Sequence, residues 1–279
     1  MAEPVTVHLP RGDTAKPGLC LDVAGSGELV VFLHGIGGNR TNWSEQVALV
    51  GDSFRAVAWD ARGYNGSEDY DGPLVFSDFA HDLARMLDFF GARKAHLVGL
   101  SMGGRIAQEF YALYPARVAT LTLVATMSGL ATLGEDGKRQ FVSARLDPLL
   151  KDGKTLRDVG LPAAKRLMGP NAGDALRQRL AAATASAHLG SYIKTVRASA
   201  DYDRTDNLGN IAVPTLLVFG EHDPLTRPEM GREMHRKIKG SEFVLIADSG
   251  HLINMEQPDA FNAALLAFLG KNRSAANAA

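Results

Sequence analysis

The chain of 279 residues carries 30 Lys and Arg against 31 Asp and Glu, so its formal net charge is -1. Without an excess of positive charge or a basic block, nucleic acid is not an expected partner. Hydrophobic residues make up 46% of the chain, and no apolar run approaches the length of a membrane span, so no membrane partner is expected either. The length allows one large domain or a domain with an insertion.

The amino terminus and the cysteine content bear on the cellular compartment. The first residues, from Met1 to Pro4, lack the basic and apolar segments of a signal peptide. Cys20 is the single cysteine of the chain, so it cannot form an internal disulfide, and its apolar neighbours favour a packing role. These observations predict a cytoplasmic protein.

Strands and helices alternate through the first half of the chain. Two continuous apolar runs, 28–33 and 118–124, are typical of strands buried on both faces of a sheet. The expected strands are 5–9, 18–23, 28–33, 55–59, 95–100 and 118–124, and the expected helices are 41–50, 76–90 and 105–113. This alternation predicts an α/β fold with a doubly wound, mostly parallel sheet.

The alternation is interrupted after Ala125. Residues 127–208 hold no expected strand but contain Arg- and Ala-rich helical segments, and we interpret them as a helical lid. The lid would be inserted into a core domain formed by 1–126 and 209–270, and the small polar residues 271–279 are expected to be a disordered tail. The remaining expected elements are helices over 175–187, 191–200, 228–238 and 258–269 and strands over 215–219 and 242–246.

A Gly-x-Ser-x-Gly pattern centred on Ser101 lies between an expected strand and an expected helix. So sharp a turn leaves no room for Cβ atoms at Gly99 and Gly103. It would project the Ser101 hydroxyl above the sheet and direct the N–H of Met102, at a helix N-terminus, toward the same space. The pattern therefore predicts a nucleophile elbow, with Ser101 as the nucleophile and Met102 as an oxyanion-hole donor.

A glycine cluster follows the apolar strand at 28–33 and runs from His34 to Gly38. Such a loop gives the backbone the freedom to present N–H groups to a ligand, and the N–H of Ile36 is the expected second donor of the oxyanion hole. Taken alone, the segment is equally well interpreted as a simple turn. His34 is expected to shape this loop by hydrogen bonding.

A serine hydroxyl needs a base to remove its proton, and the base needs an acid to orient it. Two loops after downstream strands supply candidates, because ligands gather at the carboxyl ends of parallel strands. His251 follows a Ser-Gly turn and is the expected base, and Asp223, which precedes a proline, is the expected acid. The order Ser101, Asp223, His251 is the one that accompanies a nucleophile elbow.

Other titratable residues in these loops leave alternatives open. Glu221 or Asp248 could replace Asp223 as the acid, and His222 is expected to be a loop contact. No residues have the spacing of a metal site, and the glycine-rich loops lack a phosphate-binding lysine and a dinucleotide fingerprint, so neither a metal nor a cofactor is expected. The histidines expected at the surface or in packing are His8, His81, His96, His188 and His235.

Five short motifs, in this order along the chain, resemble those of the α/β-hydrolase family. They are His34-Gly35, Asp60-x-Arg62-Gly63, Gly99-Leu100-Ser101-Met102-Gly103-Gly104, Gly220-x-x-Asp223 and Gly250-His251, and they span nearly the whole chain. The resemblance implies the α/β-hydrolase fold with a Ser-His-Asp triad. Asn65 departs from the family pattern, because glycine is commoner at that position.

Within this family the chain is most similar to the 3-oxoadipate enol-lactonases and related small-molecule ester hydrolases. The similarity lies in 99–104, in 202–208 and in 250–258, which reads Gly-His-Leu-x-x-Met-Glu-x-Pro. The carbon–carbon bond hydrolases of aromatic ring cleavage usually have Asn before the nucleophile and Trp after the catalytic His. This chain has Leu100 and Leu252 there, which argues against that activity.

These residues predict a serine hydrolase that cleaves a small-molecule ester, lactone or amide through an acyl-enzyme intermediate. One or two lid arginines facing inward would suit a substrate carboxylate, and otherwise they would cover solvated helix faces. Two alternatives stay open: a carbon–carbon bond hydrolase, and a hydrolase-fold ligand receptor with little turnover. A monomer or a small homo-oligomer would fit. The lid arginines are Arg139, Arg145, Arg157, Arg166, Arg177, Arg179, Arg197 and Arg204.

Overall fold

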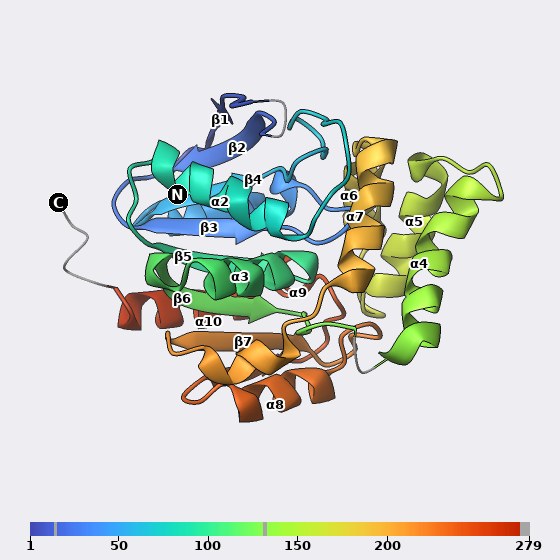
Figure 1. Cartoon of the computed structure of the whole chain (residues 1–279). Coiled ribbons are helices and arrows are strands. Elements are labelled where there is room, and N and C mark those ends of the chain that lie inside the picture. The colour runs from blue at the N-terminus through green and yellow to red at the C-terminus, as the bar shows by residue number, and fades with distance from the viewer. Residues whose placement is uncertain (14–15, 131–132, 274–279) are drawn as a thin grey trace.

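The computed structural model describes residues 1–13, 16–130 and 133–273, and Figure 1 shows the arrangement of the elements. Within these ranges eight strands form one sheet in the order β1-β2-β4-β3-β5-β6-β7-β8. The pairs β1–β2 and β2–β4 are antiparallel, and the other neighbouring strands are parallel. The strands are β1 Val5–Leu9, β2 Leu19–Ala24, β3 Leu29–Leu33, β4 Arg55–Trp59, β5 Ala95–Leu100, β6 Val118–Val124, β7 Thr215–Gly220 and β8 Glu242–Ile246.

The expected doubly wound, mostly parallel sheet is therefore confirmed, and each strand lies within one residue of its expected bounds. Strand β3 shows why its sequence is apolar throughout. Val31 and Leu33 pack into the core on one face of the sheet, and Val30 and Phe32 pack into the core on the other. Side chains alternate between the faces of a strand, so a strand covered on both sides has no polar positions.

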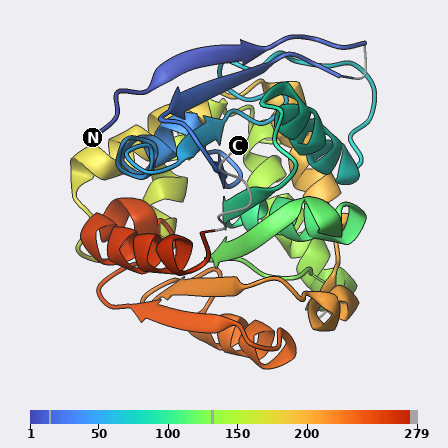
Figure 2. The same ribbon diagram turned by 90° about the vertical axis from the view of Figure 1, so that its left-hand side faces the viewer.

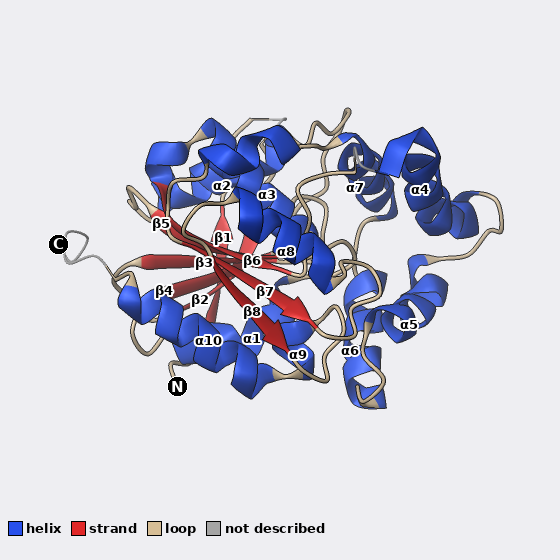
Figure 3. Cartoon of the chain, turned by 90° about the horizontal axis from the view of Figure 1, so that it is seen from below, coloured by secondary structure: helices blue, strands red, loops and turns tan. Residues whose placement is uncertain are grey.

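Helices cover both faces of the sheet (Figure 3). On one face lie α2 (Ser77–Phe89), α3 (Met102–Leu113) and α8 (Pro228–Lys237), and on the other lie α1 (Ser44–Val50), α9 (Ile253–Glu256) and α10 (Pro258–Lys271). Helix α2 buries Phe79, Leu83 and Met86, whose spacing of three to four residues puts them on the side that faces the sheet.

The segment between β6 and β7 forms a helical insertion, which contains α4 (Gly134–Leu150), α5 (Leu156–Leu167), α6 (Asp174–Ala185) and α7 (Leu189–Asp201). In Figure 1 these helices stand beside the carboxyl ends of the strands, and Figure 2 views the molecule from the opposite end. An isolated bridge between Gly129 and Asp203 joins the two ends of the insertion. We propose that residues 127–208 act as a lid on the sheet.

Two elements differ from their expected bounds. The helix expected over 41–50 begins as a 3-10 helix at Arg40–Trp43, because the Asn39 side chain accepts a hydrogen bond from Thr41 N and caps that turn, and α1 then follows. The expected tail is partly wrong, since Lys271 belongs to α10 and its Nζ lies 2.6 Å from Glu242 Oε1. Residues 274–279 lie outside the described residues.

The departure from the family pattern at Asn65 has a conformational explanation. Asn65 has a φ of 43°, in the left-handed region that favours glycine and, after glycine, asparagine. Its side-chain Nδ2 also donates a hydrogen bond of 3.0 Å to Asp60 Oδ2. Asparagine therefore fits the same turn.

None of the helices in the described residues combines the length and the apolar character that a membrane span requires.

Two buried histidines make the fold sensitive to acid. Burial lowers the pKa of His34 and of His96 below the ordinary value of 6.5, so both stay neutral in the folded protein. Below pH 6.5 the unfolded chain binds these protons more readily, and stability is lost as the pH falls toward the folded pKa values. Between pH 7.5 and 5.5 we therefore expect the free energy of urea unfolding to fall. His96→Gln should reduce this fall, and an equal fall in that variant would contradict the assignment.

Candidate active site

The strand order places a crevice at the carboxyl ends of β3 and β5. Strand β4 pairs with one side of β3, and the chain then crosses to β5 on the other side. Ligands bind at such a reversal of strand order in open α/β sheets. Leu33 and Gly99 lie opposite each other in the β3–β5 pair, so the glycine cluster after β3 and Ser101 after β5 meet at this point.

Ser101 lies in a strained turn between β5 and α3, with φ 54° and ψ -112°. A Cβ atom on Gly99 would lie 2.3 Å from Gly103 O, and a Cβ atom on Gly103 would lie 2.1 Å from Leu33 O. Both glycines are therefore needed for the turn to pack against the sheet. The turn is also fixed from the loop after β6, because Thr126 Oγ1 donates a hydrogen bond of 2.6 Å to Ser101 O.

We expect Gly103→Ala to destabilise the protein by about 3 kcal/mol, since the new methyl group would press against the backbone of β3. The change should also displace Ser101, because the turn could no longer pack closely against β3. Gly190→Ala is a matched control: a Cβ atom there meets nothing within 4 Å, and the residue lies in helix α7. Urea unfolding of the two variants tests this. Equal stability of Gly103→Ala and the parent protein would contradict the tight turn.

The glycine cluster lies directly against the serine. A Cβ atom on Gly35 would lie 3.2 Å from Ser101 Cβ. The N–H of Ile36 is in the same loop, and the N–H of Met102 is the first of α3, where a helix leaves its N–H groups without intrahelical acceptors. Within the described residues, neither N–H donates a hydrogen bond. Both are therefore available to an oxyanion beside Ser101.

The loop is held in place by His34. Ala61 N donates to His34 Nε2 at 3.0 Å, so this nitrogen carries no proton. The other nitrogen, Nδ1, is then protonated and donates to Gly35 O at 2.8 Å. His34 is fully buried and its pKa is lowered by burial, so it stays neutral and ties β3 to the loop after β4. This matches the loop-shaping role expected for it.

Asp223 and His251 meet across the ends of β7 and β8. His251 Nδ1 donates a hydrogen bond of 2.8 Å to Asp223 Oδ2. Asp223 also accepts hydrogen bonds from Leu225 N at 2.8 Å, from Thr226 N at 2.9 Å and from Thr226 Oγ1 at 2.6 Å. Burial alone would raise the pKa of Asp223, but the charge on His251 and these hydrogen bonds hold the pKa below its ordinary value. Asp223 is therefore an ionised acceptor for His251.

A pocket of about 180 Å³ opens between this end of the sheet and the helical insertion. Its wall contains Ser101, His251 and Ile36 from the core and, from the insertion, residues of α4, α5, α6 and α7. Met102 adjoins Ser101, and Asp223 lies behind His251. The structure thus brings the five predicted site residues to one place. Ser101 and His251 face the space in which a small molecule would bind.

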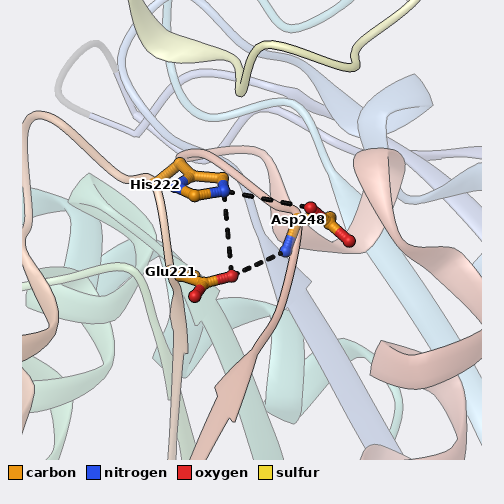
Figure 4. A group of neighbouring side chains, drawn as sticks. All are labelled: Glu221, His222 and Asp248. Carbon is orange, nitrogen blue, oxygen red and sulfur yellow. Dashed lines mark hydrogen bonds and ion pairs between the residues drawn. The ribbon is translucent and has the colours of Figure 1, made fainter.

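The other two candidate acids lie together on the surface (Figure 4). His222 Nε2 is 3.7 Å from Glu221 Oε2 and 3.9 Å from Asp248 Oδ1, and Asp248 N donates to Glu221 Oε2 at 3.2 Å. The atoms with which Glu221, His222 and Asp248 could bind a metal ion lie within 4.8 Å of one another, and all three residues are exposed. We therefore interpret the three residues as a group of surface ion pairs. His251 has Asp223 as its carboxylate partner instead.

Some functional contacts were not predicted from the sequence. Thr226 Oγ1 lies 3.2 Å from His251 Nδ1 and also bonds to Asp223, and nothing in the sequence distinguishes it from other loop threonines. Glu256 accepts hydrogen bonds from Gly250 N at 2.9 Å and Leu252 N at 2.9 Å, which fixes the backbone on both sides of His251. Glu256 could have been found from the sequence, because it belongs to the motif at 250–258.

The lid arginines divide between two environments. Arg145 and Arg166 line the pocket. Arg204 instead pairs with Glu109 at 2.7 Å, and other lid arginines form surface contacts, such as Arg177 with Asp174 at 3.0 Å. Arg105, on α3 in the core, also lines the pocket, although the sequence did not single it out. Its signal was a charged residue directly after the Gly-Gly pair of the elbow, at the start of an otherwise apolar helix face.

Comparisons with known proteins agree with this architecture. The chain is 30% identical over 235 residues to 3-oxoadipate enol-lactonase 1 of Acinetobacter baylyi, covering 83% of this chain and 85% of that one. It is 29% identical to a 2-hydroxy-6-oxononadienedioate/2-hydroxy-6-oxononatrienedioate hydrolase of Klebsiella pneumoniae, covering 88% of each. A malate-bound thermophilic esterase from Thermogutta terrifontis superposes with a TM-score of 0.86 at 28% identity, covering 97% of this chain and 100% of that one.

The same conclusion follows from a family model. The model described as the alpha/beta hydrolase fold matches residues 28–258, which begin just before β3 and end at the first residue of α10. This range contains the glycine cluster, the elbow, the helical insertion and the loops after β7 and β8. The resemblance drawn from the sequence motifs is thus confirmed, and the chain belongs to the α/β-hydrolase fold family.

Proposed function

We propose that the protein is a serine hydrolase that cleaves a small-molecule ester or lactone through an acyl-enzyme on Ser101. The observation that carries the proposal is the hydrogen bond of 2.8 Å between His251 Nδ1 and Asp223 Oδ2, at the wall of the pocket that Ser101 also lines. A base oriented in this way beside a serine in an elbow is the arrangement that activates a hydroxyl for attack on a carbonyl. The lactonase and esterase names of two relatives support the substrate class.

In the first half of the proposed reaction, His251 Nε2 takes the Ser101 proton as Oγ attacks the carbonyl carbon. The N–H groups of Ile36 and Met102 donate to the oxygen that becomes negative, which commonly lowers such a barrier by about 3 kcal/mol per donor. Asp223 keeps Nδ1 protonated, so that Nε2 is the free base, and its charge stabilises the imidazolium. His251 then returns the proton to the departing alkoxide, leaving the acyl group on Ser101.

In the second half, water replaces the alcohol. His251 removes a proton from this water, which attacks the acyl carbon through a second oxyanion in the same position. Collapse of that intermediate returns the proton from His251 to Ser101 Oγ and releases the carboxylic acid. Every step uses groups of this chain and water.

The experiment that tests the proposal is covalent trapping. A 4-nitrophenyl phosphonate ester should transfer one phosphonyl group to the protein, abolish hydrolysis of 4-nitrophenyl butyrate, and appear by peptide mass mapping on Ser101. Urea-unfolded protein is the control and should not react, since the serine is activated by the fold. A hydrolase activity that survives full labelling, or a label on another residue, would contradict the proposal.

A second candidate is carbon–carbon bond hydrolysis, which the similarity to the Klebsiella pneumoniae hydrolase favours. Leu100 and Leu252 stand where Asn and Trp are usual in that group, so we place this activity second. The two activities are separated by measuring kcat/KM of one protein sample for two compounds. A vinylogous diketone reports carbon–carbon bond hydrolysis, and 4-nitrophenyl butyrate reports ester hydrolysis. A receptor with little turnover would hydrolyse neither compound.

A further inference from the structure

Arg105 is a buried cation without a carboxylate partner. It lies on α3, is only 4% exposed, and its Nη1 donates to the backbone oxygen of Ser199 at 2.9 Å. Within the described residues no Asp or Glu forms an ion pair with it. Arg62, the same kind of residue elsewhere in the core, differs sharply, because its guanidinium bonds to Asp82 at 2.6 and 2.9 Å. Arg62 has the counter-charge that buried arginines usually need, and Arg105 lacks it.

A second arginine approaches the same place from the helical insertion. Arg145, on α4, lies with its guanidinium carbon 3.8 Å from the centre of the Phe141 ring, and the guanidinium carbon of Arg105 is 5.9 Å from the same ring. The Nη1 of Arg145 donates to Phe141 O at 2.9 Å. No carboxylate among the described residues pairs with Arg145 either. Both guanidinium groups therefore lie within 6 Å of the centre of one aromatic ring at the pocket wall.

The pKa values reflect this shortage of negative charge. The pKa of Arg105 is lowered to about 10, mainly by burial and, after a raising effect of Tyr202, by the positive charge of Arg145. The pKa of Arg145 is also lowered to about 10, mainly by burial; Tyr192 raises it, and the positive charge of Arg166 lowers it. Both stay charged at neutral pH. An anion between them would offset the repulsion and the loss of hydration at once.

The rest of the pocket adds positive charge. Arg166 and Lys154 line it from the insertion. Asp158 also lines it, but its carboxylate is exposed and accepts hydrogen bonds from Thr155 N at 2.8 Å and Thr155 Oγ1 at 2.7 Å. Asp158 thus caps helix α5 and does not neutralise the two inner arginines. The pocket beside Ser101 therefore has an excess of positive charge, and its two inner arginines have no carboxylate partner among the described residues.

We propose that Arg105 and Arg145 bind a carboxylate of the substrate, so that the enzyme acts on esters or lactones that carry a negative charge a few carbon atoms from the scissile carbonyl. A planar guanidinium group can hold a carboxylate through two parallel hydrogen bonds. Arg105 lies in the first turn of α3, four residues or about 6 Å along the helix axis from Ser101, the residue that precedes this helix, so the subsite lies close to the reacting serine. The inference rests on the proposed function, since it assumes that Ser101 attacks the ester.

The test compares two esters of equal chain length. Mono-(4-nitrophenyl) adipate carries a free carboxylate at the far end of its acyl chain, and 4-nitrophenyl hexanoate is its neutral counterpart. For the parent protein, kcat/KM should favour the adipate. In Arg145→Gln the adipate-to-hexanoate ratio of kcat/KM should fall about 10- to 100-fold, mainly through a higher KM for the adipate, since a charge-assisted hydrogen bond is lost.

Three further variants make the result specific. Arg105→Gln should show the same fall, and if that buried change prevents folding, the half-buried Arg145 still decides the test. Arg139→Gln is the matched control on the same helix, because its guanidinium is exposed and paired with Asp136, and it should leave the ratio unchanged. An equal loss with both esters in Arg145→Gln, or a parent protein that favours the hexanoate, would overturn the subsite. Hydrolysis of both esters by Ser101→Ala would instead overturn the proposed function.

Discussion

Replacing Ser101 by alanine is expected to lower kcat/KM for 4-nitrophenyl butyrate by about four to six orders of magnitude. Without its oxygen, the site keeps the oxyanion donors and His251 but has no nucleophile. Initial rates measured with purified protein, corrected for spontaneous hydrolysis, give the comparison. Turnover by the alanine variant at the parent rate would show that Ser101 is not the nucleophile.

The same position offers a test in which activity and stability move in opposite directions. Ser101 is held at φ 54° and ψ -112°, a conformation that costs a residue with a Cβ about 1 to 3 kcal/mol. Ser101→Gly should therefore be inactive and yet more stable by about 1 kcal/mol, after the greater entropy of its unfolded chain is subtracted. Ser101→Ala keeps the Cβ and should unfold close to the parent temperature. Equal melting temperatures for all three proteins would argue against a strained nucleophile.

Asp223→Asn should lower kcat by about 10⁴-fold while leaving substrate binding largely intact. Oδ1 accepts from two backbone N–H groups, and Oδ2 accepts from Thr226 Oγ1 and from His251 Nδ1. An amide has one acceptor atom and one donor atom for these positions. If its oxygen stays with the backbone, its NH₂ faces His251 Nδ1 and moves the ring proton to Nε2, where it blocks the base. Rates with 4-nitrophenyl butyrate measure the loss.

The neighbouring acids provide the control for Asp223. Glu221→Gln and Asp248→Asn make the same chemical change at residues that bond to each other and to His222 on the surface. Both variants should retain kcat within about twofold, because a surface pair contributes little. If Asp248→Asn lost activity as Asp223→Asn is expected to, the acid would be misassigned. A pH profile adds a second readout: since the pKa of Asp223 is held below its ordinary value, the parent protein should not lose this carboxylate above about pH 4.

The sheet was predictable because its signals are local. The runs at β3 and β6 are apolar throughout since both faces of the sheet are covered, and the elbow carries its glycines within five residues. Asp223 and His251 could be found because the ends of parallel strands meet at one edge. The structure places His251 Nδ1 2.8 Å from Asp223 Oδ2, as expected for an acid and a base that follow neighbouring parallel strands.

What the sequence left open depends on contacts between distant segments. Arg105 and Arg145 are separated by a strand and a loop, and nothing local shows that α4 returns to the side of α3 that carries Arg105. The bounds of α4 and α5 were not predicted either, because their apolar residues pack on other parts of the insertion, as Leu146 and Leu156 pack with Tyr192 and Val196. Amphipathic patterns show that a helix packs, but not on which partner.

The contacts of Glu256 have a consequence for exchanging parts between related enzymes. Besides the backbone beside His251, this carboxylate accepts a hydrogen bond of 2.7 Å from Gly169 N in the insertion, and His251 N donates to Leu167 O at 2.8 Å. The loop that carries His251 is thus held by hydrogen bonds to the turn that follows α5. In a chimaera that carries another enzyme's insertion between β6 and β7, the turn that supports the His251 loop would also be replaced. Residues 167–169 and 250–256 should therefore be exchanged together between related enzymes. Because these hydrogen bonds involve the backbone of the turn, we expect insertions or deletions in it to be tolerated far less than side-chain substitutions at Leu167.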